Sequence, residues 1–161
     1  MILSIHINET IFLRNEHEVA AAIDRALTMR SSGLTCDTSS FLYHKTEDPV
    51  PKEASLTVTV NHDRRCGGLV WYADGDTAER LAESGGKDFA DSIWVSVNLD
   101  PLAFDPELMS DPWTPTYMHR TSALPIPVLR AAIEEFCRNG TGDRPTCIQW
   151  IEGNFDGTIL E

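Results

Sequence analysis

The sequence predicts an α+β fold in which a mainly antiparallel sheet packs with two principal helices in a single domain spanning residues 1–161. Two stretches carry apolar residues at helical spacing, and both are framed by capping signals. Several short runs alternate apolar and polar residues with only short turns between them, which favours antiparallel hairpins over long parallel crossovers. Counting these runs predicts roughly five to seven strands. A chain of 161 residues suits one core.

The amino-terminal part predicts a strand over residues 2–7, a possible second strand over 10–13, and then a helix. Asn15 is a good helix cap, and Glu18 three residues later completes a pattern like a capping box. The helix is expected to end near Arg30, with Gly33 as its stop signal. Its expected buried stripe consists of Val19, Ala22, Ile23, Ala26 and Leu27.

The central part predicts the body of the sheet. Residues 39–44 are expected to form a strand, and residues 46–54 a charged, proline-containing loop. Residues 56–61 alternate most clearly, and after a turn at 62–65 the chain returns as a partner strand over 66–73. Residues 77–84 fit either a short helical turn or a loop. A further strand over 93–99 places Ile93, Val95, Val97 and Leu99 on one face and Trp94, Ser96 and Asn98 on the other.

Residues 100–127 form a different kind of segment. They hold six of the nine prolines together with several acids and large aromatic side chains. A long ordered loop in a compact domain is usually functional, and prolines lower the entropy that a binding surface loses. The candidate interface residues are Asp100, Asp105, Glu107, Asp111, Trp113 and Tyr117. The same aromatic residues equally fit a lid over the sheet, and the sequence does not choose between interface and lid.

Residues 124–152 predict a helix, its stop and a final strand. Pro127 suits the first helical turn, and Asn139-Gly140 supplies the left-handed stop. After a polar turn at 141–144, residues 147–151 are expected to form a strand centred on Trp150. The expected apolar face of the helix consists of Val128, Leu129, Ala132, Ile133 and Phe136. Among the aromatic residues, Trp71, Phe136 and Trp150 are expected in the core.

Composition excludes several classes of function. Thirteen Lys and Arg against twenty-five Asp and Glu give a net charge of −12, which argues against direct nucleic-acid binding and permits attraction to a basic partner. No run is long enough to span a bilayer, and residues 1–7 lack the features of a leader, so a cytoplasmic location is expected. The four cysteines are expected to be buried free thiols, although a disulfide between Cys137 and Cys147 is conceivable.

No catalytic or metal-binding motif is apparent. The five histidines lack the spacing of a zinc site, and no glycine pair is followed by the residues of a phosphate-binding loop. Neither a nucleophile elbow nor the zinc-deaminase pattern is present. We therefore expect no metal, no cofactor and no enzymatic activity.

The proline-initiated helix, the short glycine-containing turn and the Arg-Pro-Thr-Cys-Ile-Gln-Trp strand resemble the first numbered family of immunity proteins of bacterial polymorphic toxin systems (Imm family one). The resemblance is densest over residues 124–152 and extends more loosely over 68–99, which include Gly-Leu-Val-Trp-Tyr. It implies a protein that binds the toxin domain encoded in the adjacent gene and occludes its active site or substrate path. The toxin class implied is a deaminase of nucleic acid or nucleotides.

Two other classes of function remain open at this point. One is a small-molecule-binding α+β module in which Trp71, Tyr72 and Trp94 line a pocket beside the sheet. The other is a hydrolase or transferase with dispersed acids, which would need a cleft that holds paired carboxylates.

Overall fold

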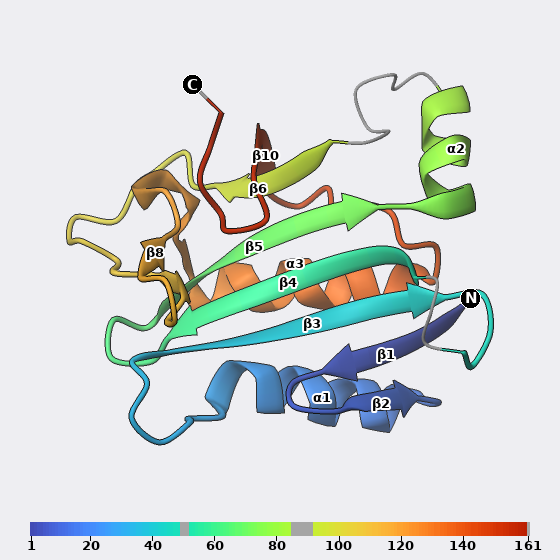
Figure 1. Ribbon diagram of the computed structural model, residues 1–161, viewed down its shortest axis with the longest axis horizontal. Helices are drawn as coiled ribbons and strands as arrows, with labels where there is room; N and C mark the ends of the chain where they lie inside the picture. Colours follow the sequence, from blue (N-terminus) through green and yellow to red (C-terminus); the bar gives the residue numbers. More distant parts are fainter. Residues whose placement is uncertain (49–51, 85–91, 161) are drawn as a thin grey trace.

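The computed structural model describes residues 1–48, 52–84 and 92–160, and it confirms the α+β class (Figure 1). One eight-stranded sheet has the strand order β10-β6-β5-β4-β3-β1-β2, with β9 paired to β5 beside this path. Every pairing described in the sheet is antiparallel. Its strands are β1 (Ile2–His6), β2 (Thr10–Leu13), β3 (Cys36–His44), β4 (Lys52–Asn61), β5 (Cys66–Ala73), β6 (Ile93–Val97), β9 (Leu124–Pro125) and β10 (Gln149–Gly153).

Two helices form a second layer on one face of the sheet, α1 (Glu16–Thr28) and α3 (Ile126–Asn139) (Figure 1). A shorter helix, α2 (Gly75–Glu83), follows β5 at the end of the sheet. The remaining elements are a separate hairpin, β7 (Met109–Asp111) with β8 (Thr116–Tyr117), and the 3₁₀ helix η1 (Arg120–Ser122). No helix in the described ranges is both long and apolar enough to cross a membrane.

The predicted signals at the start of α1 operate as a capping box displaced by one residue. The Asn15 side chain accepts a hydrogen bond from the Glu18 N–H at 3.0 Å, as expected for the cap. The Glu18 carboxylate accepts a hydrogen bond from the Arg14 N–H at 2.6 Å, whereas in a standard capping box it would accept from the N–H of the cap residue. Two orphan backbone donors at the helix start are thereby satisfied. The buried residues of the helix are Ala22, Ile23, Ala26 and Leu27.

Helix α3 begins and ends close to its predicted bounds. Pro127 lies in the first turn, and Gly140 has a φ of +67°, the left-handed conformation that stops the helix. The predicted apolar face is wrong at Val128, which is 39% exposed. This residue lies at the edge of the stripe that faces the sheet, which consists of Leu129, Ala132, Ile133, Phe136 and Cys137.

The main core lies between the helices and the sheet. Four alternate residues of β4 face the helices and are at most 1% exposed: Ala54, Leu56, Val58 and Val60. Two large side chains of this layer have their polar atoms paired, as burial favours. The Tyr43 hydroxyl donates to the carbonyl oxygens of Phe136 and Cys137 at 2.9 Å each, and the Trp71 indole N–H donates to the Gly142 carbonyl at 3.0 Å. These bonds fix the carboxyl end of α3 against the middle of the sheet.

Several predicted boundaries of the central strands and of α2 are wrong or were left open. Strand β3 begins at Cys36 rather than 39, and β4 already begins at Lys52, inside the predicted loop 46–54, of which residues 49–51 lie outside the described residues. The charged Glu53 belongs to the strand because its buried carboxylate accepts the Thr77 N–H at 3.1 Å and so caps α2. Of the two interpretations of residues 77–84, the helical one is right.

The ends of the last two long strands also differ from the prediction. Strand β10 begins at Gln149 rather than 147, because the Cys147 N–H is bound to the Glu135 carboxylate at 3.0 Å. Strand β6 ends at Val97, which leaves Leu99 79% exposed in the following turn. The alternation predicted for this strand is otherwise right, since Trp94 packs against the main core and Val95 belongs to a second core on the opposite face.

Candidate interaction surface

The segment that was expected to be either an interface or a lid folds into a hairpin with an ordered tip. The Asp111 carboxylate accepts the N–H groups of Trp113 and Thr114 at 2.9 and 3.3 Å and so caps the turn between β7 and β8. Prolines 112 and 115 flank the tip and restrict its backbone. Trp113 stands at this tip and is 94% exposed, although it is among the largest apolar side chains of the chain.

The base of this segment is tied to the ends of β3, β4 and β5. The buried Asn61 amide donates to the carbonyl oxygens of Pro106 and Glu107 at 3.2 and 3.1 Å. The Cys36 thiol donates to the same Glu107 carbonyl at 3.3 Å and accepts the Met109 N–H at 3.4 Å. We call this set of contacts from Asn61 and Cys36 the anchor of the hairpin. Sequence analysis missed both residues, because their partners lie 45 or more positions away along the chain.

Part of the segment covers the sheet, but not through the aromatic residues that the lid interpretation named. Leu108, Met118 and Ala123 are buried against Cys66, Val70 and Val95 in the second core, on the sheet face opposite α1 and α3. The Met118 thioether lies 2.7 Å from the position that a Cβ on Gly68 would take, so a larger residue there would displace the end of the Met118 side chain. The segment is therefore a lid through its buried aliphatic residues, while its aromatic residues Phe104, Trp113 and Tyr117 are exposed.

The acidic candidates mostly hold the segment in shape. Asp105 accepts the Glu107 N–H at 3.0 Å, and Asp111 caps the hairpin turn as described. Glu107, at a strained φ of +46°, forms an ion pair with Arg64 at 2.8 Å. Asp100 is exposed in the turn after β6. A hollow of about 230 Å³ brings together three of the six candidates, Asp105, Glu107 and Tyr117.

The three expected core residues differ in burial. Trp71 and Phe136 are fully buried, whereas Trp150 is only partly buried. Trp150 donates its indole N–H to the Pro145 carbonyl at 2.8 Å, and the Arg144 guanidinium lies 4.4 and 5.8 Å from the ring centres of Trp94 and Trp150. Burial lowers the pKa of Arg144 to about 10, which still leaves the guanidinium charged at neutral pH over two indoles.

All four cysteines are free, so the conceivable Cys137–Cys147 disulfide is wrong, and Cys147 is exposed rather than buried. Burial raises the pKa of the Cys66 thiol to about 11 and that of Cys137 to about 12, and it raises the pKa of Cys36 as well. Partial loss of hydration, together with the neighbouring Glu135 carboxylate, raises the pKa of Cys147 to about 11. These thiols are protonated at neutral pH and are poor nucleophiles. Within the described residues, no cluster of three or more His, Cys, Asp or Glu side chains could hold a metal ion.

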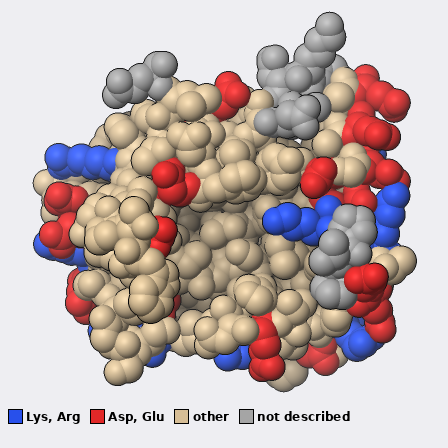
Figure 2. All heavy atoms as spheres, viewed as in Figure 1, with Lys and Arg blue, Asp and Glu red and all other residues tan. Residues whose placement is uncertain are grey.

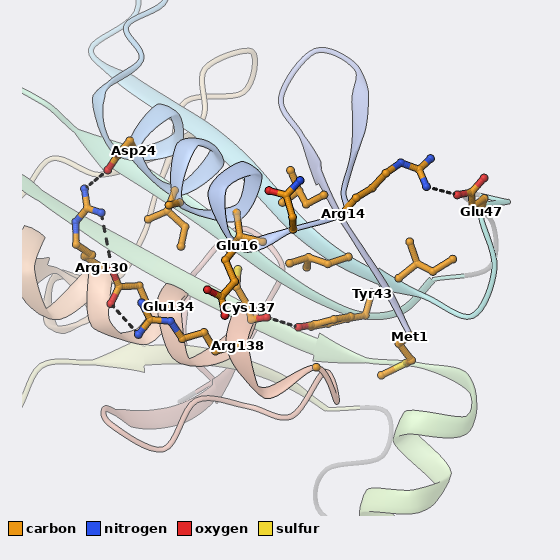
Figure 3. A pocket seen from close by; sticks show the side chains of 18 residues that line it. Met1, Arg14, Glu16, Asp24, Tyr43, Glu47, Arg130, Glu134, Cys137 and Arg138 are labelled. Carbon is orange, nitrogen blue, oxygen red and sulfur yellow. Dashed lines mark hydrogen bonds and ion pairs between the residues drawn. The ribbon is translucent and has the colours of Figure 1, made fainter.

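Among the described residues, Trp71, Tyr72 and Trp94 do not line one pocket together; Trp71 lines a hollow of about 440 Å³ with Arg144 and Trp150 instead. Trp71 and Trp94 face the helices, whereas Tyr72 faces the opposite side and packs against Phe155 at 5.2 Å between ring centres. A larger groove of about 1020 Å³ lies instead at the edge of the helical layer, over Tyr43 (Figure 3).

Three of the four acids that line this groove, Asp24, Glu47 and Glu134, form ion pairs with arginines. Three arginines that line it form ion pairs with neighbouring acids, as the dashed lines in Figure 3 mark. They are Arg14 with Glu47 at 2.7 Å, Arg130 with Asp24 at 2.7 Å, and Arg138 with Glu134 at 3.7 Å.

Comparison with known proteins gives one match. The family model described as Immunity protein Imm1 matches residues 7–152. No curated protein and no solved structure matches the chain. The match includes the central sheet, the hairpin and its anchor, and the Arg144–Trp150 contact.

Proposed function

From the premise that this chain belongs to the immunity protein Imm1 family, we propose that it binds its cognate toxin domain through the hairpin β7–β8 and blocks the toxin's active site or substrate path. Family membership makes the chain an immunity protein that acts against a toxin. We propose in addition that the hairpin is the binding surface and that the chain acts by blocking the toxin. The proposed toxin is encoded in the adjacent gene and is a deaminase of nucleic acid or nucleotides. The chain would act by binding rather than by catalysis, in the cytoplasm, where its free thiols stay reduced.

The exposed Trp113 at the hairpin tip carries this proposal. An indole side chain that is 94% exposed contributes little to the stability of its own fold, yet it offers one of the largest apolar surfaces that a side chain can bury in a partner. Tryptophan is enriched among the residues that dominate binding energy at protein interfaces. The capped, proline-flanked turn holds the backbone of the tip in place, so binding costs less conformational entropy than it would for a mobile loop.

The charge of the chain supports the class of partner. A toxin domain that handles nucleic acid needs a basic cleft, and a protein with a net charge of −12 is attracted to such a cleft. Electrostatic attraction of this kind acts mainly on the association rate and weakens as salt rises. The dissociation rate is expected to depend more on the desolvated aromatic contact.

The test begins with co-expression of the chain and the adjacent toxin domain in a bacterium, scored by survival and by co-purification. With purified proteins, Trp113→Ala is expected to raise the Kd more than about 30-fold, mostly through faster dissociation, because a central tryptophan anchor contributes about 2 kcal/mol or more. Raising the salt concentration is expected to slow association of the wild type and of the variant alike.

Val128→Ala is the matched control, because Val128 is also an exposed apolar side chain but lies on α3 in the helical layer. Its Kd is expected to stay within a factor of two of the wild type. If Trp113→Ala and Tyr117→Ala both left the affinity unchanged in a toxin complex, the hairpin would not be the binding surface, even though the immunity function would stand.

A further inference from the structure

The sheet face opposite α1 and α3 has an unusual composition. Strand register places alternate residues of four neighbouring strands on this face, because paired residues of antiparallel strands point to the same side. In this part of the face, which we call the floor, the residues are Ser4 and His6 of β1, Thr38, Ser40, Leu42 and His44 of β3, Ser55, Thr57 and Thr59 of β4, and Gly68, Val70 and Tyr72 of β5.

Apart from Lys52 and Glu53 at the start of β4, where the register with β3 shifts, this face holds no Lys, Arg, Asp or Glu over these four strands, although such residues make up 24% of the chain. A sheet face that only meets water normally carries charged and long polar side chains. Short hydroxyl side chains dominate here instead, and in the middle of the floor Ser40, Leu42 and Thr57 are half-buried rather than covered. The composition is that of a surface shaped to meet a partner rather than to face solvent alone.

The hydroxyl groups are held in pairs across the strands. Thr38 and Thr59 lie 3.2 Å apart through their hydroxyl oxygens, and Ser40 and Thr57 lie 3.0 Å apart. A hydroxyl offers one donor and two acceptor sites, so each pair retains acceptor capacity toward a bound group. Because the pairs fix the rotamers, this capacity is presented without a large entropy cost on binding.

Two segments stand above the floor along parts of its border, so the floor lies in a hollow. On one side the hairpin segment packs down through Met118 over Gly68, and on another Phe155 of the carboxyl-terminal segment packs against Tyr72. Figure 2 views this face and shows a largely uncharged hollow at its centre, with acidic side chains on several sides of it and a basic side chain at one edge. The wall formed by the hairpin segment carries the Trp113 tip, so the hollow is continuous with the proposed toxin-binding surface.

We propose that this hollow receives an uncharged, polar segment of the toxin, flanked on the toxin by basic residues that meet the acidic surroundings. This inference rests on the proposed function and extends its contact surface from the hairpin tip to the floor. A charged side chain inserted into the hollow would lose hydration with no opposite charge on the floor to compensate it. Polar groups such as amides and hydroxyls would instead find the acceptors of the Ser and Thr pairs, and the net charge of −12 favours basic flanks over acidic ones.

The test introduces a charge into the floor. In Thr57→Lys a long basic side chain enters the middle of the hollow, and the Kd for the cognate toxin domain is expected to rise at least 100-fold. Thr57→Val keeps the shape but removes the hydroxyl, and a rise of only a few-fold is expected. Ala131→Lys adds the same charge at an exposed position of α3 in the helical layer, and its Kd is expected to stay within a factor of two.

Each variant is first compared with the wild type by circular dichroism and urea unfolding, so that loss of the fold is not read as loss of binding. If Thr57→Lys does not fold, Ser40→Lys places the same charge from the neighbouring strand. In the wild-type protein, the methyl signals of Thr38, Thr57 and Thr59 are expected to shift on addition of toxin. Unshifted methyl signals, or a folded Thr57→Lys that binds as the wild type does, would overturn the inference.

Failure of this inference is distinguishable from failure of the proposed function. If Trp113→Ala weakens binding while the floor variants bind normally, the toxin contacts the hairpin alone. If the wild type does not bind the toxin domain at all, the proposed function itself is wrong.

Discussion

Replacing Asn61 with alanine removes four hydrogen bonds at the point where the hairpin segment joins the sheet. Its amide donates to the carbonyls of Pro106 and Glu107, and its side-chain oxygen accepts the N–H groups of Asp63 and Arg64 at 3.2 and 3.1 Å. Asp63 and Arg64 are exposed, so water can replace the two accepted bonds at little cost. The bond donated to Pro106 is buried and the bond donated to Glu107 is partly buried, so water cannot easily replace them.

The magnitude follows from these two donated bonds. Each contributes roughly 1 kcal/mol net, so losing both costs about 2 kcal/mol. Both carbonyls keep a thiol contact, from Cys36 to Glu107 at 3.3 Å and from Cys66 to Pro106 at 3.8 Å, so incomplete satisfaction of the buried Pro106 carbonyl adds up to about 2 kcal/mol. Asn61→Ala is therefore expected to lower the free energy of unfolding by about 2–4 kcal/mol. With a slope of roughly 2 kcal/mol/M in urea, the midpoint of unfolding should fall by about 1–2 M. Toxin affinity should fall as well, because the anchor no longer holds the base of the hairpin.

Two further variants separate the contributions at this site. Asn61→Asp keeps the oxygen that accepts the two N–H groups of the turn, but it loses both donors and places a carboxylate beside two carbonyl oxygens. We therefore expect it to be at least as destabilised as Asn61→Ala near neutral pH. Asn8→Ala removes an exposed amide in the turn between β1 and β2 and should change the free energy by less than about 0.5 kcal/mol. An Asn61→Asp protein as stable as the wild type would refute the reasoning, since the bonds to Asp63 and Arg64 would then carry the stabilisation.

The remaining predictions concern α3 and the strand it contacts. Burial alone would raise the pKa of Glu135, but hydrogen bonds from Thr146 and Cys147 outweigh it and lower the pKa below its ordinary value of 4.5. Glu135 therefore stabilises the fold above about pH 4.5 and loses this contribution as the pH falls through its lowered pKa. In urea unfolding, the free energy of unfolding of Glu135→Gln should be lower than that of the wild type at neutral pH, and the two values should converge in acid. Phe136→Ala should cost about 3–5 kcal/mol in the same assay, because the ring is fully buried and meets Tyr43 edge to face. Trp150→Ala should cost less than Phe136→Ala, because Trp150 is only partly buried, and the opposite order would contradict this ranking.

Sequence patterns correctly predicted the elements whose geometry depends on residues close together along the chain. The cap formed by Asn15 and Glu18, the proline in the first turn of α3 and the left-handed Gly140 each act within a few residues, so the sequence displays them directly. The alternation in β4 and β5 predicted an antiparallel hairpin for the same reason. Predicted ends failed where a distant side chain decides them, as when Glu135 captures the Cys147 N–H and delays the start of β10.

The candidate site was predictable only in part. Proline and aromatic content drew attention to residues 100–127, and Trp113 stands exposed within them. Composition could not tell which acids are free, because it does not reveal that Asp105 and Asp111 cap turns or that Glu107 pairs with Arg64. The uncharged floor also escaped notice, since its residues are dispersed over four strands and come together only through the register of the sheet.

The anchor has a consequence for the moment at which protection begins during synthesis. Strands β3, β4 and β5 form a meander of contiguous residues, 36–73, whose contacts close only short loops and can form early. The hairpin packs on that meander and is also held by residues 156 and 157. The His119 N–H donates to the Gly157 carbonyl at 3.1 Å, and the Ser110 hydroxyl donates to the Asp156 carbonyl at 2.6 Å. A nascent chain can thus form the β3–β5 meander well before its tryptophan tip is fixed. The proposed binding surface is complete only after residues 156 and 157 have been synthesised.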